Sequence, residues 1–176
     1  MSLYTEWRNL SDNHESQEAE VKFWEEYLKV EAGIYNEILN NKMDVVEGKV
    51  SELAEKFGTT NEFFMGFIDG ISESLKEDIV LEDVEADKEV SIKIDWEKLY
   101  NNMVTVEAHW LYNLQGWEDI LPADQRKEII KAYKKSKTIV KEAKIGRNDS
   151  CPCGSGKNIR NVVESKESHV YFKICR

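Results

Sequence analysis

Two cysteines lie one residue apart in the stretch GRNDSCPCGSGK, residues 146–157. Thiolates at this spacing, among Gly, Pro, Ser and Asn, are typical of a chain that turns tightly around a metal ion. Structural zinc takes four soft or borderline ligands in a tetrahedron, so Cys151 and Cys153 predict half of a zinc site. The nineteen residues that follow contain no closely spaced Cys or His pair to complete it.

The other residues that could do chemistry are scattered. No Ser or Cys is paired with a His at a recognisable spacing, and GSGK lacks the remaining residues of a phosphate-binding loop. The sequence therefore predicts that the chain is not an enzyme. Three cysteines, all near the C-terminus, do not form a disulfide framework and indicate a reducing, cytoplasmic compartment.

Charge divides the 176 residues into two parts. Residues 1–121 carry 10 Lys and Arg against 28 Asp and Glu, whereas residues 122–176 carry 14 against 6. The second part could dock on the acidic body, or it could lie along RNA phosphates, which Lys and Arg contact without sequence preference. These interpretations do not exclude each other. The docking candidates are Lys131, Lys134, Lys135, Lys141, Lys144 and Arg147.

Apolar spacing predicts an all-α fold, a bundle of about five helices. The expected helices span about 14–41, 44–57, 60–75, 96–114 and 122–145. Val90, Ile92 and Ile94 alternate as in a short strand, although a single strand would lack a partner. No apolar run approaches the roughly 20 residues that span a bilayer, so we expect no membrane insertion.

Residues 51–71 resemble a helix-turn-helix, but their chemistry is wrong for DNA. The second helix would present Phe64, Phe67 and Asp69 to the groove, and residues 44–86 carry 12 acids against 3 lysines. DNA phosphates would repel this surface. We therefore expect a packed helical hairpin and no DNA binding. Gly66 and Gly70, four residues apart, predict the close approach of a neighbouring helix.

The stretch IGRNDSCPCGSGK closely resembles the opening of the SEC-C motif, the small zinc knuckle named for the C-terminus of the secretion ATPase SecA. The family pattern is C-x-C, eight residues, then C-C or C-H, preceded by G-R-N-[DE]-P. Cys151 and Cys153 match the first pair, while Ser150 replaces the usual Pro. More loosely, the chain looks like small bacterial SEC-C proteins with a helical body before the knuckle. The resemblance implies zinc and a non-catalytic adaptor that associates with the ribosome or the export chaperone SecB.

The second half of this motif should fall at Val162 and Val163, which cannot bind metal. Residues 158–166 can be encoded by A/T-rich codons. If one A is inserted before them, the shifted frame reads KKYKKCCGK directly after Gly156 and then reaches a stop codon. Our hypothesis is a one-base deletion that makes residues 158–176 a read-through tail. His169 and Cys175 are then the only later ligand candidates. We expect zinc to be missing or weakly bound in the chain as written.

These observations divide the chain into three parts. An acidic helical body ending in a basic helix spans 1–142, the first half of the knuckle spans 143–157, and the tail spans 158–176. The alternative to an adaptor is a helical protein–protein interaction module. In that case the acidic body binds the partner and the tail is dispensable.

Overall fold

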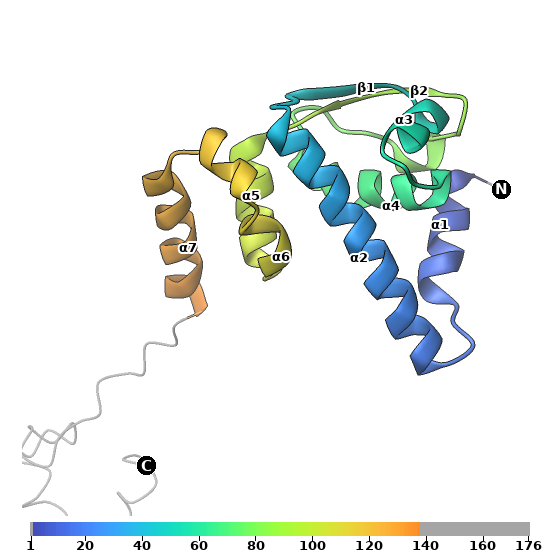
Figure 1. Ribbon diagram of the computed structural model, residues 1–176, viewed down its shortest axis with the longest axis horizontal. Coiled ribbons are helices and arrows are strands. Elements are labelled where there is room, and N and C mark those ends of the chain that lie inside the picture. Colours follow the sequence, from blue (N-terminus) through green and yellow to red (C-terminus); the bar gives the residue numbers. More distant parts are fainter. Residues whose placement is uncertain (1, 138–176) are drawn as a thin grey trace, which may run out of the picture. The chain divides into compact units, whose positions relative to one another are not determined.

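The computed structural model describes residues 2–137 (Figure 1). The predicted boundaries at 142 and 157 lie outside this range. Its α-helices are α1 (Leu3–Asp12), α2 (Gln17–Asn40), α3 (Val50–Lys56), α4 (Asn61–Ile71), α5 (Trp96–Thr105), α6 (His109–Tyr112) and α7 (Ala123–Lys137). The strands are β1 (Val45–Lys49) and β2 (Glu89–Lys93), and the 3-10 turns are η1 (Ser72–Ser74), η2 (Leu81–Asp83) and η3 (Gln115–Asp119). No helix within 2–137 combines the length and apolar character needed to cross a bilayer.

Helix α4 forms the centre of the core because apolar residues occupy most of its circumference. Phe64, Phe67, Ile68 and Ile71 have no exposed surface. A helix that is apolar nearly all round must be covered by several neighbours. Helices α1, α2 and α3 pack against it, and α4 lies between α2 and α1 in Figure 1.

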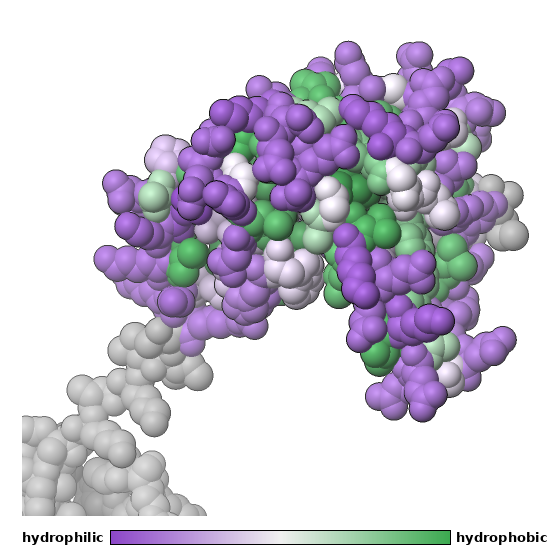
Figure 2. Space-filling view, in the orientation of Figure 1, coloured by the Kyte–Doolittle hydropathy of each residue, from purple (hydrophilic) through white to green (hydrophobic). Residues whose placement is uncertain are grey.

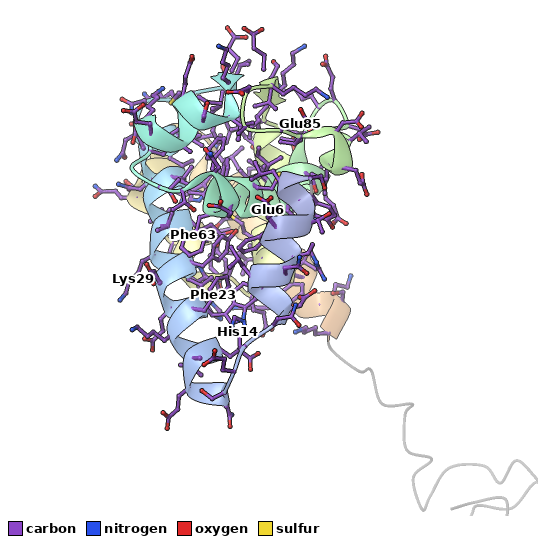
Figure 3. All side chains as sticks on the ribbon, turned by 90° about the vertical axis from the view of Figure 1, so that its right-hand side faces the viewer. Glu6, His14, Phe23, Lys29, Phe63 and Glu85 are labelled. Carbon is purple, nitrogen blue, oxygen red and sulfur yellow. The ribbon has the colours of Figure 1, made fainter. Side chains whose placement is uncertain are left out.

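Helix α1, which the sequence pattern did not predict, supplies an aromatic side chain that packs directly against α4. Trp7 is only 4% exposed, and its indole Nε1 donates a hydrogen bond to Asp69 Oδ2 at 3.2 Å. Its ring centroid lies 4.7 Å from that of Tyr27 and 6.0 Å from that of Phe23. Phe23 and Phe63 fill the space between α1 and α2 (Figure 3), so the α1–α2 hairpin is closed by aromatic packing.

The predicted close approach at the α4 glycines is confirmed. A Cβ atom added to Gly66 would lie 2.8 Å from the Trp7 ring, which is too close for any real contact. A Cβ atom added to Gly70 would lie 3.3 Å from the carboxylate of Glu31 on α2. The two glycines therefore let α1 and α2 reach the same helix.

Three helices end in the same way, with one residue in the left-handed region. Lys42, Gly58 and Glu107 have φ angles of 51°, 65° and 59° and follow α2, α3 and α5. Beyond Lys42, the amide of Met43 donates to the Ile38 carbonyl at 3.0 Å, the six-to-one bond of a Schellman motif. Glycine is the usual residue in this conformation, so Gly58 indicated the end of α3 from the sequence. Lys and Glu rarely adopt a left-handed conformation, so the ends of α2 and α5 could not be read from residue type.

The predicted helix over 96–114 is wrong for this reason. It ends at Thr105, and the chain turns at Glu107 before the short helix α6 begins. A helix over 96–114 would carry Val106 and Trp110 on the same face as Leu99 and Met103, but they are 71% and 48% exposed. Trp117 is fully buried instead, and its Nε1 donates to the Leu111 carbonyl at 3.0 Å.

The predicted all-α fold with five helices is also wrong. Residues 2–137 contain seven α-helices and a two-stranded antiparallel sheet, β1 with β2. Val46 lies opposite Ile92, and Gly48 lies opposite Val90. Val46, Val90 and Ile92 are buried, so one face of the sheet covers the core.

The strand expected at 90–94 has its partner in a segment that we assigned to a helix. Val46, Val50, Leu53 and Phe57 recur at helical spacing, and this pattern concealed β1. Gly48 has φ of 142°, which no α-helix contains, and α3 begins only at Val50. The adjacent β-branched valines at 45 and 46 favour a strand, and pairing with β2 decides between the two structures.

The segment that resembles a helix-turn-helix is a packed hairpin, as predicted. Helices α3 and α4 contact each other, and Gly58 turns the chain between them. Phe64 and Phe67, which a recognition helix would present to the groove, have no exposed surface. This pair of helices serves the core.

A carboxylate lies beneath α4 where α2 passes it. Glu31 Oε1 accepts a hydrogen bond of 3.4 Å from the Tyr27 hydroxyl. Burial raises the pKa of Glu31 to about 7, because the charged form loses hydration, and the Tyr27 hydrogen bond only partly opposes this shift. Burial likewise raises the pKa of Tyr35, which is 2% exposed.

Replacing Gly66 by Ala should destabilise the protein by about 1–3 kcal/mol, since the rigid Trp7 ring cannot move away from the added methyl group. Gly33→Ala, in α2, is the matched control, because a Cβ at this position would meet no atom of another segment within 4 Å. That substitution should stabilise by roughly 0.5–1 kcal/mol through helix propensity. Urea unfolding of both variants measures the difference, and equal effects would contradict the close packing of α1 on α4.

Glu31 should make stability fall as pH rises. Its folded-state pKa of about 7 lies above the ordinary value of 4.5, so its contribution is complete below about pH 4.5 and is lost through pH 7. Glu31→Gln should therefore increase the free energy of unfolding at pH 8 by on the order of 2 kcal/mol and raise the melting temperature there. At pH 5 it should change both only a little. Glu37→Gln, on the same helix, is the control. A gain at pH 8 no larger than that of the control would contradict the buried carboxylate.

Candidate functional site

The structure places part of the predicted docking set on one helix. Lys131, Lys134 and Lys135 lie on α7 and are exposed. The other predicted site residues lie outside the described residues and are Lys141, Lys144, Arg147, Cys151, Cys153, His169 and Cys175. The structure therefore shows the surroundings of the docking candidates on α7 alone.

Helix α7 has one packed side and one basic side. Ile129, Ile130 and Tyr133 are half-buried and pack on the body, where α7 contacts α5. The opposite side carries four exposed lysines, which we call the basic ridge: Lys127, Lys131, Lys134 and Lys135. Residues at i, i+4, i+7 and i+8 share one face of a helix, so the ridge runs along its outer surface. Figure 2 shows hydrophilic residues over this part of the molecule.

The last turn of α7 is fastened to the loop after α5. Glu107 Oε1 accepts hydrogen bonds from Lys137 Nζ at 2.6 Å and from the Tyr133 hydroxyl at 3.0 Å. Lys137 also lies 4.8 Å above the centre of the Tyr133 ring. The hydrogen bond from Lys137 lowers the pKa of Glu107 and raises that of Lys137, so both stay charged. These contacts hold α7 with its ridge turned away from the body.

One interpretation of the basic stretch was that it docks on the acidic body. This holds for one side of α7 and not for the whole helix. The helix docks through apolar residues and through Lys137. Among the residues that the structure describes, Lys127 forms its ion pair with Asp124 of its own helix, at 4.0 Å. Both partners of that pair are more than three-quarters exposed, so the pair contributes little. Docking therefore leaves the ridge lysines at the surface.

A cleft that no sequence pattern predicted lies beside the ridge. Tyr100 of α5 and Tyr112 of α6 line it together with Arg126 and Lys127 of α7. No spacing in the sequence groups these residues, because the turn at Glu107 brings α6 and α7 to the same side of α5. The basic stretch was recognised, but its tyrosine neighbours could be found only in the fold.

One comparison with known proteins found a relative. A 26-residue stretch is 65% identical to protein translocase subunit SecA 1 of Clostridioides difficile (strain 630). The match covers 15% of this chain and 3% of that protein, so the chain spans only a small part of its relative. This short stretch is consistent with a motif of the SEC-C type. No family model and no solved structure matches the chain.

We expect the donor set of the chain as written not to fit a four-ligand zinc site. Cys151 and Cys153 supply two thiolates, and the positions of the second pair hold Val162 and Val163. Residues 2–137 contain no group of three His, Cys, Asp or Glu side chains that could hold a metal ion. A tetrahedral site would have to recruit distant donors, whose misfit commonly weakens binding by about 10–100-fold.

The purified chain should therefore contain less than one tightly bound zinc ion, because two thiolates cannot close a structural site. Metal analysis measures the ratio, with Cys151→Ser as the control for thiolate-dependent zinc. A variant that carries a second cysteine pair eight residues after Cys153 should hold one zinc ion per molecule. One tightly held zinc in the chain as written, lost in His169→Ala or Cys175→Ala, would contradict this expectation.

Proposed function

We propose that this chain is a non-catalytic, cytoplasmic adaptor of the SEC-C type. Its basic C-terminal part would dock to the ribosome and its RNA, or to the protein-export machinery. The intact motif would bind zinc through Cys151 and Cys153, and the chain as written would have lost the second ligand pair.

The similarity of a 26-residue stretch to a protein translocase subunit carries this proposal. The cysteine stretch has the residues and spacing of the SEC-C opening, and an export or ribosomal context follows from that resemblance. The one-base deletion accounts for the missing cysteine pair. Sequencing the gene across the A-rich run tests it directly, since codons that cannot be written in the shifted frame would refute it.

The charge of α7 supports docking to a polyanion. Six of its residues are Lys or Arg and two are Asp or Glu, while the body before it is strongly acidic. Four of the six form the basic ridge, and Lys137 pairs with Glu107 of the body. A row of exposed lysines along a helix is suited to phosphates, which it neutralises without reading sequence.

Filter binding of single-stranded RNA at two salt concentrations tests this function. The full chain should bind, and its affinity should fall steeply with salt because each neutralised phosphate releases counterions. Replacing Lys131, Lys134 and Lys135 by Gln should lower the salt slope by about 2, since each phosphate contributes roughly 0.7 for single strands. The matched control replaces Lys22, Lys29 and Lys98 by Gln, which changes net charge equally away from the ridge.

Two results would contradict the proposal. The first is no RNA affinity at low ionic strength, and the second is an equal loss in the control triple variant. A chain ending at Lys144, compared with the full chain in ribosome co-sedimentation, separates the knuckle from the body. Retained association that is also unchanged when Lys131, Lys134 and Lys135 are replaced by Gln would favour the alternative, a helical interaction module in which the acidic body binds the partner.

A further inference from the structure

The cleft beside the basic ridge combines aromatic, cationic and amide side chains. It lies between α7 and the α6–η3 segment and has a volume of about 320 Å³. That volume is at the lower end of the range for small-molecule sites, so it suits one small unit rather than a chain. Lys127 belongs to both the cleft and the ridge, which makes the two surfaces continuous.

Arg126 provides an oriented cation in this cleft. Its Nε donates to the Leu121 carbonyl at 3.2 Å, and its guanidinium lies beside the Tyr100 hydroxyl. No carboxylate of residues 2–137 forms an ion pair with Arg126. A half-buried guanidinium held in place without an acidic partner is suited to an anion, because its planar fork matches phosphate geometry.

Tyr112 provides a flat aromatic surface whose position is fixed. Its hydroxyl is hydrogen-bonded to His109 Nδ1, and its ring meets the Tyr100 ring edge-on with centroids 6.2 Å apart. The side chain is only partly buried, so ring surface remains available in the cleft. A held aromatic ring can stack on a nucleobase at little entropic cost.

The remaining walls suit the edge of a base. Asn113 and Gln115 offer amide donors and acceptors, and Glu118 offers an acceptor. Leu114 and Ile130 supply apolar surface. Glu118 would repel a phosphate, so an anionic group belongs near Arg126 and Lys127 and the base near Glu118.

We propose that this cleft holds one unpaired nucleotide of an RNA strand whose neighbouring phosphates follow the basic ridge. The base stacks on Tyr112, and Arg126 and Lys127 contact its phosphate. From Lys127 to Lys134 the ridge is about 10 Å long, enough to follow more than one phosphate. This inference rests on the RNA docking proposed above and adds a requirement for a single strand.

The test uses the full chain and a short RNA that carries the fluorescent base 2-aminopurine. Binding should quench its emission further in the single strand, because the base stacks on Tyr112. In a matched duplex, where the base is already stacked, added protein should cause no further quenching and should bind more weakly. Tyr112→Leu should weaken single-strand binding by about 5- to 100-fold and leave the salt slope unchanged. Tyr112→Phe keeps the ring and should retain binding. Tyr4→Leu, a half-buried tyrosine on α1, is the matched control.

Arg126→Gln should weaken binding and reduce the salt slope by about 0.7, as one lost phosphate contact predicts. Circular dichroism melts of all variants report whether the fold is intact. RNA affinity without quenching, unchanged in Tyr112→Leu, would overturn the cleft proposal and leave ridge docking standing. Equal affinity for duplex, or tighter binding of free AMP than of the oligonucleotide, would also overturn it. No RNA affinity at low salt would overturn both proposals.

Discussion

The contact between Trp7 and Gly66 is the constraint on which the rest of the described fold depends. An indole ring can lie against the backbone of α4 only because that position has no side chain. The contact brings α1 onto the central helix and places the ring among Phe23, Tyr27 and Phe63. Because α1 covers one side of α4 and α2 covers another, α4 can be apolar nearly all round and still be shielded from water.

The same core explains why α7 can remain largely polar. Its half-buried residues add a thin layer to a body that is already closed by α2, α5 and the sheet. Polar contacts at Glu107 supply the remaining hold, and they exist because the α5 turn projects that side chain toward Tyr133 and Lys137. A helix held in this way can present lysines along its outer surface without loss to the core.

The basic ridge and the cleft beside it lie on the same part of an otherwise acidic body. The acidic residues that dominate residues 1–121 would keep polyanions away from most of the surface, whereas α7 carries a local excess of cations. A polyanion would therefore be restricted to the ridge and its adjoining cleft. The tyrosines there come from α5 and α6, so the body shapes the surface as well as carrying it.

The basic stretch of the candidate site and part of the fold followed from the sequence alone. The paired cysteines, the valines that replace their partners and the basic stretch are properties of residue type and spacing. The Asp95 side chain caps the start of α5, and Gly58 follows the end of α3, so both helix ends depend on chemistry local to the chain. Gly66 and Gly70 indicated close packing because only glycine removes the side chain.

Tertiary structure decided what depends on distant partners. The segment from Val45 has helical spacing, and only pairing with Glu89–Lys93 makes it a strand. Glu107 ends α5 in a conformation that its residue type disfavours, so no local signal could forecast where Trp110 would lie. The cleft joins Tyr112 to Arg126 through that turn. Local propensity acts over a few residues, whereas these outcomes were set by burial and hydrogen bonding between segments that only the folded chain brings together.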